Sequence, residues 1–175
     1  AGCSPKAIRR GLKRARPLSG RLERITSKLP FPIFVDYAHT PEGLRAVLQA
    51  LDRITDRRLI VVFGAGGDRD QGKRGPMGYA VGELADLPIV TSDNPRSEDP
   101  AVIADAVAEG VRAAGAEPLI ELDRRKAIAL ALEQADERSL VLVAGKGHEA
   151  HQTIGDQKLP FSDQDVLRNE ARRMR

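Results

Sequence analysis

Two unbroken apolar runs constrain the fold of this chain more than any other feature. Leu59–Phe63 and Leu140–Val143 consist only of aliphatic and aromatic residues, and a glycine-containing loop follows each of them. A strand with one face in water alternates apolar and polar side chains, whereas a strand covered on both faces does not. We therefore predict that both segments are central strands of a parallel sheet with helices on its two faces.

Strand-like and helix-like segments alternate along the chain from about residue 22 to its end. This alternation predicts an α/β fold with a mostly parallel sheet flanked by helices. Glu121 interrupts one of the short apolar segments, so we place that strand near an edge of the sheet. The predicted strands are 34–35, 59–63, 89–90, 119–122 and 140–143, and the predicted helices are 4–15, 41–54, 76 onward, 102–111, 123–135 and 162–174.

The basic residues are concentrated at one end of the chain. The first 24 residues hold eight of the 28 lysines and arginines but only one of the 25 acids, so the remainder is mildly acidic. Ser4 and Pro5 predict the start of a helix that ends near Ala15. Its apolar stripe is too narrow for a stable helix alone, and Pro17 follows it. We interpret this end as the tail of a preceding unit and a linker.

Composition argues against several classes of protein. Aromatic residues make up 3% of the chain, which leaves few stacking platforms for single-stranded nucleic acid. Because the basic charge is confined to one end, we expect no nucleic-acid partner. No apolar run reaches about 18 residues, so we expect no membrane partner. Cys3 is the only cysteine, and the first residues lack the apolar segment of a signal peptide, which together predict a cytoplasmic location.

Four predicted strands are followed by loops rich in charge, glycine or proline. The carboxyl ends of parallel strands meet at one edge of a sheet, where ligands commonly bind. We therefore predict a ligand site at this edge. The four loops are 36–41, 64–70, 91–96 and 144–149.

The charged residues of these loops predict the class of ligand. Arg69 and Arg96 follow neighbouring strands, and the planar guanidinium group is well suited to a carboxylate. Glu149 is an acceptor that suits an ammonium group, and Asn94 can both donate and accept. The combination predicts a small zwitterion, that is, an amino acid.

Other interpretations of the same residues stay open at this point. The two arginines could instead pair with acids that lie near them in the sequence, which are Asp68 or Asp70 for Arg69 and Glu98 for Arg96. Ion pairs of this kind would leave the guanidinium groups unavailable to a ligand.

Lysine and histidine side chains in the loops give weaker signals. Lys146 lies between two glycines and could meet a phosphate or an acidic substrate, or it could be a solvated loop lysine. His39, His148 and His151 lack the spacing of a zinc site, so we expect hydrogen bonds within loops and no metal.

Two phosphate-binding motifs are incomplete. Gly64 and Gly66 begin a dinucleotide fingerprint, but Arg69 stands in place of its last glycine. A Walker A loop fails because Arg74 replaces the required serine or threonine. We therefore expect neither a nicotinamide or flavin cofactor nor NTPase activity from this chain alone.

The loops as a set resemble the Mur ligases. The motifs that carry the resemblance are G-R-L-E-R at 20–24, D-Y-A-H-T-P at 36–41, G-G-D-R-D-x-G-K-R at 66–74, D-N-P-R at 93–96 and G-K-G-H-E at 145–149. The resemblance covers about residues 5–175 and is closest to the members that add meso-diaminopimelate to UDP-N-acetylmuramoyl-L-alanyl-D-glutamate. It implies that residues 21–175 form a Rossmann-like C-terminal amino-acid-binding domain and that residues 1–20 are the end of a central ATPase domain and a linker.

The resemblance implies an amide-bond ligase of peptidoglycan synthesis that uses ATP and Mg²⁺. The D-glutamate carboxylate would become an acyl phosphate, which the amine of meso-diaminopimelate then attacks. The family's P-loop is not in this sequence, so ATP and Mg²⁺ would be bound mainly by the missing central domain, and the chain alone should be inactive. Its partners would be meso-diaminopimelate and the UDP-MurNAc-dipeptide, and it would be a monomer.

Ten residues match functional positions of the family. The implied meso-diaminopimelate contacts are Arg69, Asp93, Asn94, Pro95, Arg96, Gly145 and Glu149, and the implied nucleotide-proximal residues are Arg21, Asp36 and His39. Arg96 favours meso-diaminopimelate, because lysine-adding relatives lack this arginine. A ligase for lysine, a folate-type glutamate ligase and a nucleic-acid-binding module that uses the basic end are the alternatives.

Overall fold

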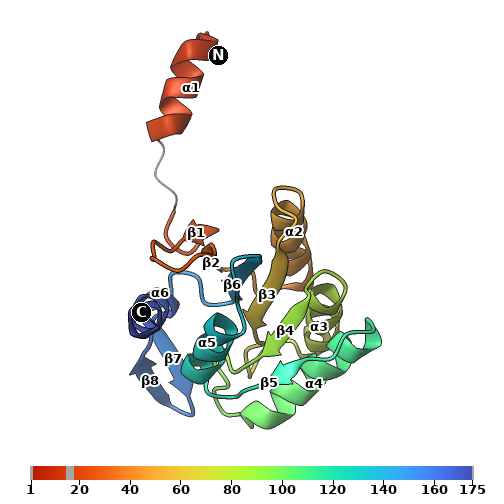
Figure 1. The fold of residues 1–175 in the computed structure, drawn as a ribbon. Coiled ribbons are helices and arrows are strands. Elements are labelled where there is room, and N and C mark those ends of the chain that lie inside the picture. Colours follow the sequence, from red (N-terminus) through yellow and green to blue (C-terminus); the bar gives the residue numbers. More distant parts are fainter. Residues whose placement is uncertain (1, 15–17, 175) are drawn as a thin grey trace.

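The computed structural model describes residues 2–14 and 18–174 and shows a six-stranded sheet with helices on both faces (Figure 1). The strand order is β1-β2-β6-β3-β4-β5. β1 is antiparallel to β2, and every other neighbouring pair is parallel, which confirms the predicted mostly parallel, Rossmann-like fold. The strands are β1 (Glu23–Arg24), β2 (Ile33–Asp36), β3 (Arg58–Phe63), β4 (Leu87–Val90), β5 (Leu119–Ile120) and β6 (Ser139–Ala144).

The helices begin where the sequence provides polar caps. The side chains of Thr40, Asp99, Asp123 and Ser162 each accept a hydrogen bond from a backbone N–H in the first turn of the helix that follows. A 3₁₀ turn, η1 (Gln71–Lys73), leads into the third helix. The helices are α1 (Pro5–Arg14), α2 (Pro41–Asp52), α3 (Arg74–Gly82), α4 (Pro100–Ala113), α5 (Arg124–Glu133) and α6 (Asp163–Arg173).

The central strands β3 and β6 are covered on both faces, as their apolar runs predict. Alternate residues of β3 point into two separate cores. Val61 and Phe63 pack with α2, α3 and α4, whereas Ile60 and Val62 pack with α5 and α6. Figure 1 shows these two groups of helices on opposite sides of the sheet. β5 lies at the edge of the sheet and both of its residues are exposed, which confirms the position predicted from Glu121.

Two parts of the chain extend this frame. The predicted first helix is confirmed as α1, which lies apart from the sheet in Figure 1, while its predicted end at Ala15 and the break at Pro17 lie outside the described residues. An antiparallel hairpin of β7 (His151–Ile154) and β8 (Gln157–Pro160) was not predicted. Among the described residues, no helix is long and apolar enough to cross a membrane.

Candidate functional site

A cleft of about 300 Å³ lies where the carboxyl ends of β2, β3, β4 and β6 meet. All four predicted loops contribute to it, so the structure brings together the segments that the sequence placed at one edge. Pro95, Arg21 and Asp36 do not line the cleft, whereas the other seven residues predicted for the site do. The lining residues are Tyr37, His39, Gly64, Gly66, Arg69, Lys73, Asp93, Asn94, Arg96, Gly145 and Glu149.

The side chains of Arg69 and Arg96 both line the cleft, and both pass close to Gly66. A Cβ atom at Gly66 would lie 3.0 Å from Nη1 of Arg96 and 3.9 Å from Cγ of Arg69. Nη1 of Arg96 donates to the carbonyl oxygen of Gly67 at 2.5 Å, and Nη1 of Arg69 donates to the carbonyl oxygen of Asp68 at 2.9 Å. These bonds orient both guanidinium groups and leave other N–H donors for a ligand.

The predicted alternative, in which both arginines form local ion pairs, is wrong. Over the described ranges 2–14 and 18–174, neither guanidinium has a carboxylate within 4.0 Å. Glu98 pairs with Arg74 instead, at 2.7 Å. The reason is geometric, because the start of α3 brings Arg74 to Glu98 from a different element. Two cations therefore face the cleft without an acidic partner.

Lys146 is fully buried, so neither of the two interpretations from the sequence describes it. Its Nζ donates to Oδ1 of Asn94 at 3.0 Å and to Oε2 of Glu149 at 3.2 Å. Nδ2 of Asn94 donates to the same Glu149 oxygen at 3.0 Å. Although burial alone would raise the pKa of Glu149, the bond from Asn94 and the Lys146 ammonium lower it below its ordinary value. Glu149 is thus held as an anion at the cleft.

Asp93 is a buried acid that lines the cleft. Its Oδ2 has no hydrogen-bond partner among the described residues, and burial raises the pKa of this carboxyl group although the cations Arg124 and Lys146 oppose the shift. Gly145 lies against it with a φ of +114°, and a Cβ atom there would be 2.6 Å from Oδ2 of Asp93. Only glycine fits at this position without strain or a clash.

The unpredicted hairpin holds the loop that carries Arg96. Nε2 of Gln152 donates to the carbonyl oxygen of Asp93 at 2.8 Å, and the N–H of Thr153 donates to Oδ1 of Asn94 at 2.9 Å. The N–H of Arg96 donates to the carbonyl oxygen of Thr153 at 3.1 Å. Arg96 has a φ of +51°, a left-handed conformation that costs an arginine about 1–3 kcal/mol. The hairpin bonds offset this strain.

Of the residues predicted to be near a nucleotide, His39 lines the cleft, whereas Arg21 and Asp36 do not. The guanidinium group of Arg21 stacks over the ring of Tyr37, 4.7 Å from its centroid. His39 contacts the same ring edge-on, with 4.6 Å between the centroids, and its Nδ1 lies 2.7 Å from the carbonyl oxygen of Tyr37. Both carboxylate oxygens of Asp36 accept backbone N–H groups, from Leu22 at 2.6 Å and from Ala38 at 2.8 Å. Asp36 therefore links the segment directly before β1 to the end of β2.

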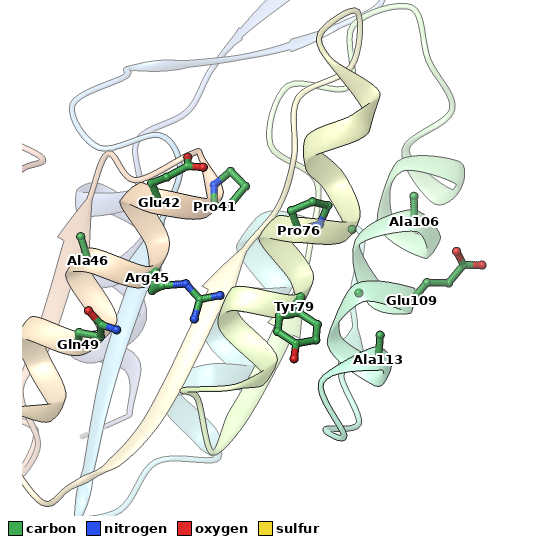
Figure 2. Close-up of a pocket in the computed structure, with 12 residues that line it drawn as sticks. Pro41, Glu42, Arg45, Ala46, Gln49, Pro76, Tyr79, Ala106, Glu109 and Ala113 are labelled. Atoms are coloured by element: carbon green, nitrogen blue, oxygen red, sulfur yellow. The ribbon is translucent and has the colours of Figure 1, made fainter.

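A larger cleft of about 750 Å³ lies elsewhere, between α2 and the pair α3–α4. Figure 2 shows Arg45 reaching from α2 toward α3, with Tyr79 of α3 beside it. None of the ten residues predicted for the site lines this groove, and Arg45 is paired with Glu83. The other charged residues that line this groove are the acids Glu42 and Glu109, whereas the strand-end cleft is lined by both cations and acids. The strand-end cleft is therefore the better candidate for recognition of a zwitterionic ligand.

The chain is similar over most of its length to a known family model and to curated proteins. The family model described as Mur ligase, glutamate ligase domain, matches residues 20–147. The chain is 45% identical over 175 residues to the UDP-N-acetylmuramoyl-L-alanyl-D-glutamate--2,6-diaminopimelate ligase of Gloeobacter violaceus, which covers 99% of this chain and 36% of that protein. It is 52% identical over 149 residues to the ligase of the same name from Lawsonia intracellularis, which covers 85% of this chain and 31% of that protein.

Solved structures show the same relationship. A UDP-N-acetylmuramoyl-L-alanyl-D-glutamate--2,6-diaminopimelate ligase superposes with a TM-score of 0.83 at 38% identity, over 99% of this chain and 35% of the other. A Mycobacterium tuberculosis folylpolyglutamate synthase complexed with ADP and AMPPCP superposes with a TM-score of 0.63 at 25% identity, over 99% of this chain and 35% of the other. The chain spans about a third of the length of the curated relatives it matches.

Proposed function

The chain belongs to the Mur ligase family, as its C-terminal glutamate ligase domain, and from this premise we propose that it binds meso-diaminopimelate for addition to UDP-N-acetylmuramoyl-L-alanyl-D-glutamate. In this proposal residues 21–175 are the amino-acid-binding domain and residues 1–20 belong to a central ATPase domain and a linker. The single observation that carries the proposal is that Arg69 and Arg96 line one cleft and that, among the described residues, neither has a carboxylate within 4.0 Å.

The charges of the cleft match those of meso-diaminopimelate. The two arginines offer planar sets of donors to carboxylates, while Asp93 and Glu149 offer acceptors to ammonium groups. L-Lysine has the ammonium groups but lacks the second carboxylate. An arginine that must face the cleft without that carboxylate leaves donors unpaired, which disfavours lysine. The remaining predicted contacts, which are Asn94, Pro95 and Gly145, shape the loops that present these charges.

For the whole protein we propose the ATP-dependent chemistry of the family. The phosphoryl group of ATP passes to the D-glutamate carboxylate, the amine of meso-diaminopimelate attacks the acyl phosphate, and phosphate leaves as the amide bond forms. This chain's part is to hold the amine in position. Arg21 and His39 are the residues that we propose for contact with the nucleotide, and the relative complexed with ADP and AMPPCP supports nucleotide use.

The residues that the structure describes do not form a cluster that fits a magnesium ion. The part of the chain that the structure describes holds no group of three or more histidine, cysteine, aspartate or glutamate side chains that could hold a metal ion. We therefore derive no step from Mg²⁺ in this domain, and we expect ATP and Mg²⁺ to be bound mainly outside it. We further propose that the protein acts as a cytoplasmic monomer, that nucleic acid and membranes are not partners, and that this chain alone is inactive.

A titration of the isotope-labelled chain by NMR, with meso-diaminopimelate and separately with L-lysine, tests the proposal. We expect shifts at Arg69, Asn94, Arg96 and Glu149 with meso-diaminopimelate and none with L-lysine. Equal shifts with both ligands would contradict the specificity and favour a ligase for another amino acid. If neither ligand causes a shift, the proposed amino-acid site is wrong for this chain.

A further inference from the structure

The two loops that carry the arginines of the cleft are joined crosswise by two carboxylates. The Arg69 loop comprises residues 64–70, and the Arg96 loop comprises residues 91–99. The carboxylate of Asp68 in the first loop accepts hydrogen bonds from Ser97 in the second, from the hydroxyl at 2.7 Å and from the N–H at 3.2 Å. In return, Oε1 of Glu98 in the second loop accepts the N–H of Asp68 at 2.6 Å.

Glu98 also anchors this crosswise pair to a helix. Nη2 of Arg74, at the start of α3, donates to both oxygens of Glu98 at 2.7 and 2.8 Å. The Arg74 side chain is only 4% exposed and that of Glu98 is 21% exposed, so the contact is partly buried. The bonds from Ser97 lower the pKa of Asp68, and the bond from Arg74 lowers the pKa of Glu98. Both side chains therefore remain charged acceptors at neutral pH.

Asp68 and Glu98 lie close to the arginines in the sequence but form hydrogen bonds between the two loops instead of ion pairs with Arg69 and Arg96. Asp68 precedes Arg69 directly and Glu98 follows Arg96 by two residues, yet each acid bonds to the opposite loop. The backbone reinforces the link, because the N–H of Gly67 donates to the carbonyl oxygen of Asn94 at 2.9 Å. Side-chain and backbone hydrogen bonds therefore both link the two loops.

We propose that Asp68 and Glu98 are positioning residues that fix the spacing between the guanidinium groups of Arg69 and Arg96, and thereby set which amino acid the cleft accepts. The choice of ligand in this inference rests on the proposed function. A fixed spacing favours a ligand whose carboxylates match it, whereas loosely held arginines would accept ligands of other lengths. Neither acid needs to touch the ligand for this effect.

The test uses the isosteric variants Asp68→Asn and Glu98→Gln, together with Ser97→Ala. Asparagine tolerates the φ of +50° at position 68, so the first variant changes the acceptor without changing the backbone preference. Exposed acids on α4 provide controls of the same chemical change, Asp105→Asn and Glu109→Gln. Calorimetry measures affinity for meso-diaminopimelate and L-lysine, and NMR of the arginine side-chain nitrogens measures the order of Arg69 and Arg96 without ligand.

We expect Asp68→Asn and Glu98→Gln each to weaken meso-diaminopimelate binding by about tenfold and to reduce the preference for meso-diaminopimelate over L-lysine. The NMR signals of Arg69 and Arg96 should shift or broaden in these variants and in Ser97→Ala. Ser97→Thr keeps the hydroxyl group, so its arginine signals should match those of the parent chain, as should those of the two controls. The Asp68→Asn and Glu98→Gln effects should be less than additive, because each breaks the same unit. Parent-like affinity and unchanged arginine signals in both variants would overturn the inference.

The two proposals fail in different ways. If the parent chain does not bind meso-diaminopimelate, the proposed function and the stated specificity are both wrong, whereas unchanged arginine signals in the variants would show separately that Asp68 and Glu98 do not fix the spacing. If one of these variants does not fold, Ser97→Ala replaces it, because this change removes one exposed hydroxyl group and with it one hydrogen bond between Ser97 and Asp68.

Discussion

Arg124 and Asp163 form a two-pronged ion pair in which neither side chain is exposed. Nε and Nη2 of the arginine donate to the two carboxylate oxygens, each at 2.8 Å, and Nη2 also donates to the carbonyl oxygen of Ala144 at 2.9 Å. Although burial disfavours the cation, Asp163 raises the pKa of Arg124. The pair joins the first turns of α5 and α6 to the end of β6, directly before Gly145.

Breaking this pair should destabilise the chain strongly. We expect Asp163→Asn to lower the free energy of unfolding by about 3–5 kcal/mol, because it leaves the Arg124 cation buried without an anion. The double variant Arg124→Met with Asp163→Leu should lose much less, because it removes both charges. Urea unfolding followed by circular dichroism measures both. A double variant that is less stable than Asp163→Asn would contradict this account.

The hairpin contact of Gln152 should be worth a measurable part of the stability. Gln152→Ala leaves the carbonyl oxygen of Asp93 without its partner, and we expect a loss of about 1–3 kcal/mol in the free energy of unfolding. The same variant should perturb the amide signal of Arg96. Lys158→Ala on the exposed strand β8 is the control and should change neither. Equal effects of the two variants would show that Gln152 has no special role.

Gly145 should tolerate no side chain. Gly145→Ala combines a strained φ of +114° with a Cβ atom placed 2.6 Å from Oδ2 of Asp93. Strain alone should cost about 1–3 kcal/mol, and meso-diaminopimelate binding should weaken as well. Gly115→Ala is a matched control, because Gly115 has a φ of +88° but nothing within 4 Å of its Cβ position. That control should lose stability and keep its affinity for the ligand, so a loss of affinity there would refute the explanation.

The Glu149 carboxylate should make stability fall in acid. Its pKa is lowered in the folded chain, so it stabilises the fold fully above the unfolded value of about 4.3 and progressively less as the pH falls through the folded value. The difference in unfolding free energy between the parent chain and Glu149→Gln should therefore be largest at neutral pH and shrink below about pH 4.3. Urea titrations from neutral to acidic pH measure this difference. A constant difference would mean that the ionisation of Glu149 does not contribute.

The ionisation of Asp93 should change stability with pH in the opposite direction to that of Glu149. Burial raises the pKa of Asp93, so the protonated form favours folding below the unfolded value of about 3.9, and this contribution is lost as the pH rises through the folded value. Asp93→Asn should thus gain stability relative to the parent at neutral pH, while its affinity for meso-diaminopimelate falls. Unfolding and calorimetry on one sample measure both changes. Lower stability with retained affinity would show that this acid is structural.

The unbroken apolar runs within β3 and β6 were sufficient to predict the centre of the sheet, although each strand begins with a polar residue, Arg58 or Ser139. The hairpin of β7 and β8 was missed, since all four β8 residues are exposed and no burial pattern marks them. The Gly155–Asp156 pair at its turn is the one signal that could have indicated a hairpin. β1 was also missed, because a pair of charged residues at the end of a linker does not read as a strand.

The site was predictable in its loops but not in the layer beneath them. Parallel strands necessarily bring their carboxyl ends together, so four loops of unusual composition were enough to place the cleft. The role of Arg124 was not accessible in this way. Arg124 and Arg125 are identical neighbours in the sequence, and only the packing of α5 buries the first and leaves the second exposed. The burial of Lys146 and the bond between Arg74 and Glu98 likewise depend on tertiary contacts.

The left-handed backbone of Arg96 has a consequence for how this position can vary. Glycine adopts such a conformation without strain and asparagine with little, so either would relieve the cost that the arginine carries. A library of variants selected only for heat resistance should therefore enrich glycine or asparagine at position 96. Selection of the same library for growth that requires meso-diaminopimelate binding should instead enrich arginine at position 96. Selection for stability and selection for ligand binding therefore favour different residues at position 96, and the residue found there indicates which selection has been stronger.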